Sequence, residues 1–134
     1  MQVGLDTSVL MRLLLALPAD QAATALTFVK DARFAGKRIV VSDLVVSEAY
    51  FALHHHYGVP KQEAIAQLLL ILRSGIVEPA DGPEVLAVLE AASRSAAKPG
   101  FVDRLIRAQY ARRLAGMATF ERAAARLPGT TVLS

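Results

Sequence analysis

Apolar positions fall into short runs and longer periodic segments that alternate along the chain. The short runs predict strands, and the longer segments, with apolar residues at helical spacing, predict helices. The predicted strands are Val3–Leu5, Arg38–Ser42, Ile76–Val77, Met117–Phe120 and Thr130–Leu133. The predicted helices are Ser8–Leu17, Asp20–Ala35, Leu44–Tyr57, Pro60–Arg73, a helix that opens at Asp81–Glu84, Phe101–Ala115 and Glu121–Leu127. Strands alternating with helices indicate an α/β fold, with a small parallel sheet flanked by helices.

Glycine and proline mark most of the predicted boundaries. Gly36 and Gly58 each follow a helical segment, and Pro60 stands at the first turn of the next helix. No internal repeat or Gly/Ser-rich linker interrupts the 134 residues. We therefore expect residues 1–134 to form a single domain.

Composition excludes several classes of protein. The chain contains no cysteine, which rules out a disulfide framework, a thiolate zinc site and a cysteine nucleophile. Its longest apolar runs fall far short of the roughly 18 residues that a membrane span needs, and no basic leader precedes them. The expectation is a cytoplasmic protein without a membrane partner.

The charge balance is mildly basic, with 15 Lys and Arg against 12 Asp and Glu. Nine of the basic residues lie from Arg73 onward, and a basic balance is compatible with a polyanionic partner such as nucleic acid. An ordinary solvated surface is the alternative explanation. The candidate substrate contacts are Arg104, Arg107, Arg112 and Arg113.

Four acids occupy positions that ordinary surface acids seldom take: Asp6, Glu48, Asp103 and Glu121. Asp6 and Glu121 follow predicted strand ends, where parallel sheets bind ligands. Glu48 shares a helical face with Leu44 and Phe51, where an unpaired carboxylate is costly to desolvate. Each acid also has a structural explanation, as a helix cap, a snorkelling side chain or, for Asp103, a pair with Arg107.

Parallel strands would bring these acids to one edge of the sheet. Two like charges 4 Å apart repel by about 1 kcal/mol in water and about 4 kcal/mol at an effective dielectric of 20, so four together require a counter-ion. Ligands that are all oxygen favour Mg²⁺ or Mn²⁺. Such an ion activates water and stabilises charge on a phosphodiester, which points to phosphodiester hydrolysis.

The segments around these acids resemble the ordered motifs of PIN domains, most closely those of VapC-type ribonuclease toxins. The resemblance extends over essentially the whole chain. The matching segments are Leu5–Leu10, Val41–Tyr50, Phe101–Ile106, Thr119–Arg122 and the tail Ala123–Leu133.

This resemblance implies a three-layer PIN-like fold and a metal-dependent endoribonuclease acting on RNA. Asp6, Glu48 and Asp103 would bind Mg²⁺ or Mn²⁺ and activate water, supported by the hydroxyl groups of Ser8 and Thr119. It also implies that the chain is the toxin component of a type II toxin–antitoxin system and forms a homodimer. A small antitoxin protein would then block its acidic pocket.

Glu121 departs from the family pattern, which usually has Asp at this fourth metal-binding and catalytic position. The extra methylene moves the carboxylate outward by about one bond length. A catalytically weakened module that only binds RNA or a partner is therefore the alternative function. A nuclease directed at DNA is a second alternative.

Overall fold

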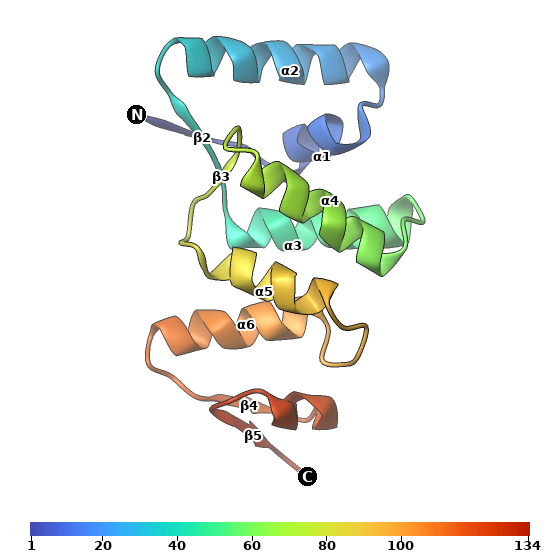
Figure 1. The fold of residues 1–134 in the computed structure, drawn as a ribbon, viewed down its shortest axis with the longest axis vertical. Coiled ribbons are helices and arrows are strands. Elements are labelled where there is room, and N and C mark those ends of the chain that lie inside the picture. Colours follow the sequence, from blue (N-terminus) through green and yellow to red (C-terminus); the bar gives the residue numbers. More distant parts are fainter. The chain divides into compact units, whose positions relative to one another are not determined.

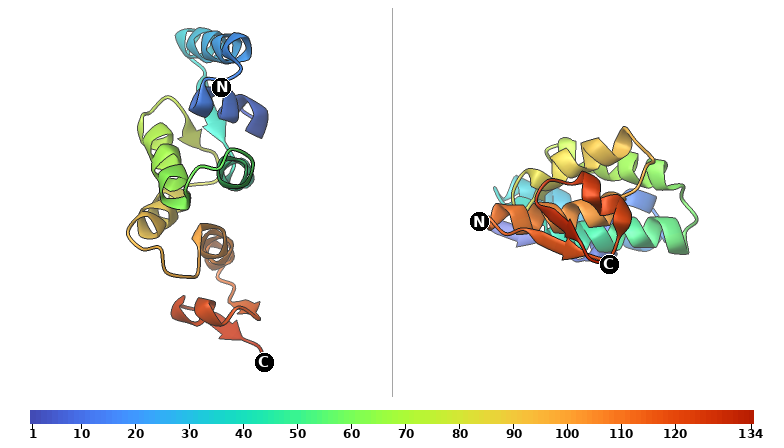
Figure 2. Two further views of the ribbon diagram at one scale, coloured as in Figure 1. Left: turned by 90° about the vertical axis from the view of Figure 1, so that its right-hand side faces the viewer. Right: turned by 90° about the horizontal axis from the view of Figure 1, so that it is seen from below.

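The computed structural model describes all 134 residues and divides them into two compact units, Met1–Pro83 and Glu84–Ser134. Each unit contains a small parallel sheet together with helices (Figures 1 and 2). The predicted α/β class is confirmed. The five strands separate into a three-stranded sheet in the first unit and a two-stranded sheet in the second.

The first unit contains three strands and five helical segments. In chain order they are β1 (Gln2–Gly4), α1 (Thr7–Leu15), α2 (Ala19–Phe34), β2 (Arg38–Val41), α3 (Asp43–Phe51), the π-helical turn η1 (Ala52–His56), α4 (Lys61–Arg73) and β3 (Glu78–Pro79). No single helix could cross a membrane by length and apolar character, although α1 and α2, bent by 108°, meet both requirements together.

The sheet of this unit is parallel and has the order β1-β2-β3. Val3 pairs with Ile39 and Val40 pairs with Glu78, so β2 is the central strand. All of Ile39, Val40 and Val41 are buried, as a continuous apolar run predicts for a strand covered on both faces. Helix α2 packs against β2 and α4 packs against β3, which completes the core of the unit.

Local signals account for most helix ends. Ser42 caps α3 by accepting a hydrogen bond from the Val45 N–H at 3.2 Å. Gly36, with φ of 83°, follows α2 and turns the chain into β2. The predicted strand Ile76–Val77 was displaced by two residues, because the residues that pair with β2 are Glu78 and Pro79.

The helix predicted over Leu44–Tyr57 is not regular throughout. Helix α3 ends at Phe51, and the chain continues as the wider turn η1, in which the Tyr57 N–H donates to the Ala52 carbonyl. His54 Nδ1 lies 2.8 Å from the Val59 carbonyl oxygen, and His55 stacks on Phe51. These contacts hold the histidine segment against its own helix.

The second unit contains α5 (Glu84–Ser93), α6 (Phe101–Arg112), β4 (Met117–Thr119), the 3₁₀ helix η2 (Arg122–Arg126) and β5 (Thr130–Val132). Helices α5 and α6 pack together, and Val85, Leu89, Phe101 and Leu105 are buried. Strands β4 and β5 run side by side in parallel, with Met117 opposite Thr130 (Figure 1).

Two phenylalanines provide a matched test of where stability resides. Phe101 is 1% exposed and Phe34 is 96% exposed. We expect Phe101→Ala to lower the free energy of unfolding by about 3–5 kcal/mol, because it removes a buried ring. Phe34→Ala should change it by less than about 0.5 kcal/mol. Urea denaturation of both variants checks this, and equal effects would contradict the burial described.

Candidate active site

Asp6 lies beyond the carboxyl end of β1 and caps α1. Its Oδ1 accepts hydrogen bonds from the Ser8 hydroxyl at 2.7 Å and the Val9 N–H at 3.1 Å. The Ser8 bond, followed by that from Val9, lowers the pKa of the Asp6 carboxyl below its usual value. Asp6 is therefore held ionised at the edge of the sheet where the strands end.

Glu48 is joined to the segment after β1 through Thr7. The Thr7 hydroxyl donates to Glu48 Oε1 at 3.1 Å, so α3 presents this carboxylate beside the first turn of α1. The prediction that Glu48 shares a face with Leu44 and Phe51 is confirmed, but the prediction that this face is desolvated is wrong. Glu48 is exposed and Leu44 is 70% exposed, because α3 buries the opposite face through Val46 and Ala49.

Asp103 lies in the first turn of α6 and is exposed. The alternative explanation, a surface pair with Arg107, is wrong, because the two side chains form no ion pair; Arg107 instead donates its Nε–H to the Pro128 carbonyl at 3.0 Å. Asp103 has no ion pair. Its carboxylate instead lines a cavity of about 200 Å³ between α6, β4 and the start of η2.

Thr119 and Glu121 line the same cavity as Asp103. The Thr119 hydroxyl oxygen accepts a hydrogen bond from the Glu121 N–H at 3.0 Å, which ties the two residues together. Glu121 caps η2 by accepting from the Ala123 N–H at 3.3 Å. The second unit thus brings three of the predicted site residues to one concave surface.

Three of the four predicted acids accept hydrogen bonds, and each does so through only one of its two carboxylate oxygens. Oδ1 of Asp6, Oε1 of Glu48 and Oε1 of Glu121 each accept a hydrogen bond. The other oxygen of each carboxylate has no partner within the protein. The structural bonds of these acids therefore leave each side chain able to bind a second ligand.

Three of the arginines predicted to contact substrate also make structural bonds. Arg104 donates its Nε–H to the Pro99 carbonyl, Arg107 donates to that of Pro128, and Arg112 pairs with Glu84 at 2.9 Å. Arg113 makes no such bond and is exposed. The guanidinium planes of Arg104 and Arg107 are thereby oriented by the backbone.

Sequence reasoning missed the role of Asp43. It is the one buried charged side chain, 1% exposed, and its backbone N–H donates to Asp81 Oδ2 at 2.7 Å. Asp81 was predicted to open the helix at Glu84, but its side chain binds the first turn of α3 instead. This pairing spans 38 residues, so nothing in the local sequence around Asp81 indicates it.

A comparison with known families identifies the family of the chain. The profile of the PIN domain family matches residues 3–129. The chain belongs to the PIN domain family. PIN domains are in general nucleases, and they typically use divalent metal ions. No curated protein sequence matches the chain.

The donor set in this PIN domain consists of carboxylate oxygens, the ligand type that hard divalent ions prefer. Each unit supplies carboxylates with an unbonded oxygen, Asp6 and Glu48 in the first and Asp103 and Glu121 in the second. No group of three or more Asp, Glu or His side chains that could hold a metal is formed. Mg²⁺ usually keeps several waters and binds through only one or two protein carboxylates, so a group of three carboxylates is not required for it to bind.

The bond from Ser8 to Asp6 yields a testable change in pKa. We expect Ser8→Ala to raise the pKa of Asp6 toward its ordinary value, because it removes the larger of the causes that lower it. A carboxyl whose pKa is lowered by folding stabilises the fold above its unfolded pKa, and this contribution disappears as pH falls through the folded pKa. Ser8→Ala should therefore reduce this acid-sensitive contribution.

NMR titration of the Asp6 carboxyl carbon measures the effect. Thr7→Val is the matched control, because it removes a neighbouring hydroxyl that binds Glu48 rather than Asp6. An Asp6 pKa that moves equally in both variants would contradict the assignment to Ser8.

Proposed function

We propose that this PIN domain is a metal-dependent endoribonuclease that hydrolyses phosphodiester bonds of RNA. The observation that supports this most directly is the cavity that Asp103, Thr119 and Glu121 line together, within a chain whose family match extends over both units. We further propose that both units act as one domain, with Asp6 and Glu48 completing the acidic set.

The proposed chemistry requires a water oxygen to bond to phosphorus while one P–O bond to a ribose oxygen breaks. Asp6, Glu48, Asp103 and Glu121 would hold Mg²⁺ or Mn²⁺ through their unbonded oxygens. The ion, when bound, supplies charge neutralisation and a more acidic bound water. Ser8 and Thr119 orient Asp6 and the Glu121 backbone through their bonds. An ionised carboxylate accepts the proton that the attacking water loses, and the leaving ribose oxygen takes up a proton.

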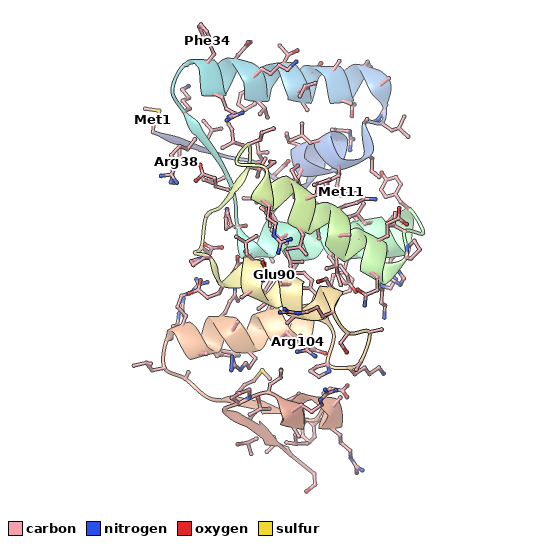
Figure 3. All side chains as sticks on the ribbon, in the orientation of Figure 1. Met1, Met11, Phe34, Arg38, Glu90 and Arg104 are labelled. Atoms are coloured by element: carbon pink, nitrogen blue, oxygen red, sulfur yellow. The ribbon has the colours of Figure 1, made fainter.

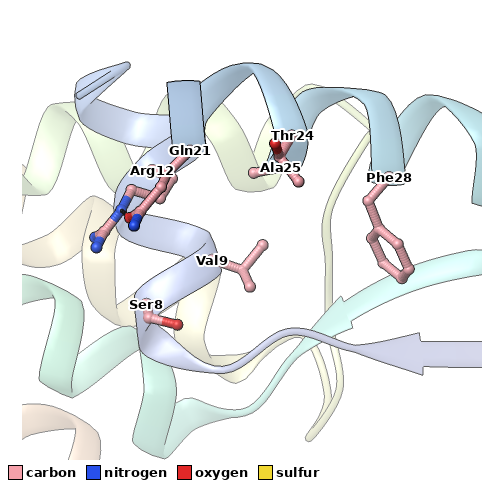
Figure 4. Close-up of a pocket in the computed structure, with 7 residues that line it drawn as sticks. All are labelled: Ser8, Val9, Arg12, Gln21, Thr24, Ala25 and Phe28. Carbon is pink, nitrogen blue, oxygen red and sulfur yellow. Dashed lines mark hydrogen bonds between the residues drawn. The ribbon is translucent and has the colours of Figure 1, made fainter. Parts of the chain in front are cut away.

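The biological assignment that we propose is the toxin component of a type II toxin–antitoxin system of the VapC type, acting in the cytoplasm. A cavity of about 360 Å³ between α1 and α2 is a candidate surface for a small antitoxin (Figure 4). Its wall begins at Ser8, which binds Asp6, and continues through Val9 and Phe28. A segment bound there would lie beside Asp6.

We also propose a homodimer. Leu70 on α4 is 74% exposed and lies at a groove that Leu13 and Leu14 of α1 line. Exposed apolar side chains of this kind are typical of contact surfaces between copies. Light scattering of the purified chain, alone and with the product of the gene directly upstream, tests the dimer and the antitoxin assignments.

Glu121 supports the alternative function, a catalytically weakened module that binds RNA or a partner. It is one methylene longer than the usual aspartate, and it is engaged as a cap of η2. The activity measurement below distinguishes the two functions.

The primary test is cleavage of a single-stranded RNA by the purified chain. We expect cleavage with Mg²⁺ or Mn²⁺, none with EDTA, and a loss of at least about 100-fold in Asp6→Asn and in Asp103→Asn, the range that removal of a proton-transfer group or an electrostatic stabiliser costs. Asp20→Asn is the matched control, because Asp20 is an exposed acid in the first turn of α2.

Unfolding curves of the same variants show whether a loss of cleavage results from a loss of folding. Asparagine retains the cap at Asp6, since Asn and Asp are about equally good N-caps. A parent protein that binds RNA but never cleaves it, and whose melting temperature is unaffected by Mn²⁺, would favour the binding module. A DNA strand of the same sequence tests the DNA-directed alternative.

Glu121 offers a gain-of-function prediction. We expect Glu121→Asp to raise the rate of cleavage, because it returns the carboxylate to the distance usual in the family and retains a residue that caps well. Glu121→Gln, which keeps the length and removes the charge, should lower the rate. Single-turnover rates at saturating Mn²⁺ measure both changes, and a slower Glu121→Asp variant would show that the site is built around the longer side chain.

A further inference from the structure

The opposite edge of the first sheet carries a basic cavity that the proposed catalysis does not use. It has a volume of about 610 Å³ and lies where β2 and β3 begin, beside the C-terminal end of α2. Four cationic residues line it, Lys30, Arg33, Lys37 and Arg38. The substrate contacts predicted from the sequence were Arg104, Arg107, Arg112 and Arg113, so this group was not anticipated.

Most of this positive charge is not neutralised by the protein. Arg38 forms a two-bond pair with Glu78, at 2.6 and 3.0 Å. Lys30 and Lys37 have no ion pair, and Arg33 acts on Glu78 only through a weaker charge interaction than that of Arg38. Glu78 is the only acid in the lining, and Asp31 lies on a different face of α2. The cavity therefore has a net positive lining.

An exposed aromatic ring stands among these cations. Phe34, the last residue of α2, lines the cavity and is 96% exposed. Figure 3 shows Phe34 projecting outward from the end of α2, and Arg38 projecting from the start of β2. Single-stranded nucleic acids are bound by this combination, in which cations follow the phosphates and aromatic rings stack on bases.

We propose that this cavity, which we call the basic groove, is a second binding site for single-stranded RNA. In it Lys30, Arg33 and Lys37 contact backbone phosphates, and a base stacks on Phe34. The choice of RNA as the ligand rests on the proposed function. The groove itself requires neither the acidic residues nor a metal ion.

The groove is separated from Asp6 by the length of the sheet. Arg38 opens β2 and Val41 ends it, a rise of about 10 Å at roughly 3.3 Å per residue. Asp6 follows the carboxyl end of the paired strand β1. A strand of RNA bound in the groove is thus anchored away from the acids, and only a substrate of several nucleotides can occupy both places.

A concave surface favours RNA over a membrane as the ligand. A lipid surface is bound by an apolar face that protrudes as a whole, whereas here the Phe34 ring projects beside cations that line a cavity into which a flexible strand fits. The two ligands share an anionic phosphate, and they differ in whether a stacking base is present.

The first experiment measures binding of a fluorescently labelled 20-nucleotide RNA in EDTA, so that cleavage does not interfere. The affinity for RNA falls as salt rises, by about 0.7 in log affinity per unit of log salt for each phosphate contact. We expect Lys30→Gln combined with Lys37→Gln to remove two such contacts and so to make this dependence less steep by about 1.4. Phe34→Ala should weaken binding by at least about fivefold, the lower end of the effect of removing a stacking ring.

The charge-matched control is Lys61→Gln combined with Arg94→Gln, which removes two exposed cations elsewhere on the chain. Phe34→Leu is the control for the ring, because it keeps an apolar side chain without an aromatic face. Equal losses in the charge control, or full affinity in Phe34→Ala, would overturn the proposal.

A second experiment observes the stacking directly. The chain contains no tryptophan, so Phe34→Trp introduces a single tryptophan at the groove. We expect its fluorescence to be quenched when RNA binds, and to be unchanged on addition of inorganic polyphosphate, which has no bases. Unchanged fluorescence at saturating RNA overturns the stacking contact. Binding to phosphatidylserine vesicles that depends on Phe34, without binding to RNA, would assign the groove to membranes instead.

These outcomes are independent of those that test the nuclease. If the chain binds RNA through the groove but cleaves none, the nuclease proposal fails and the groove is retained. If the groove variants bind and cleave as the parent does, the groove proposal fails alone. If both hold, the Lys30 and Lys37 double variant should lose cleavage of the 20-nucleotide RNA and keep that of a dinucleotide.

Discussion

Parallel pairing of β1, β2 and β3 is the constraint on which the first half of the site depends. Because β1 and β2 run in the same direction, the helices that follow them begin at the same edge of the sheet. Helix α1 begins after Asp6, and α3 begins after Ser42. Bonds beyond the strands, such as that from the Leu5 N–H to the Val40 carbonyl, continue this pairing up to Asp6. The Thr7–Glu48 contact is a consequence, since two helix starts that adjoin at one edge bring their side chains within reach.

Helix capping and metal binding are compatible roles for these acids. A cap needs one oxygen atom, and a carboxylate has two, so Asp6 and Glu121 can satisfy backbone N–H groups and still present an oxygen outward. The cap also has an effect on the chemistry, because the bonds that lower the pKa of Asp6 keep it ionised. Asp103 differs from the others, since it has no bond of this kind and lies in the first turn of α6, where the helix dipole stabilises a negative charge.

Local sequence signals accounted for most elements, and long-range contacts accounted for the errors. Proline and glycine punctuation predicted the helices to within a few residues. The period of α3 correctly grouped Leu44, Glu48 and Phe51, but it did not tell which face is buried, because both faces of that helix are apolar. The roles of Asp43 and Asp81 depend on a contact between distant segments. Strands β4 and β5 form a sheet of their own, and the pattern of apolar and polar residues does not determine which strands pair with each other.

In the first unit, acidic side chains lie at the carboxyl edge of the sheet and basic side chains lie at its amino edge. This separation would assign binding and cleavage of RNA to different surfaces. Phosphates are repelled by Asp6 and Glu48 at the carboxyl edge and attracted by Lys30, Arg33 and Lys37 at the amino edge. Affinity would then come mainly from a surface that does no chemistry, whereas the acidic edge contributes only once a divalent ion has reversed its charge. Salt would weaken capture of the substrate more than it slows the bound complex, because counterion release accompanies the phosphate contacts of the basic groove. A protein with such a division can retain RNA binding when its acidic residues are altered.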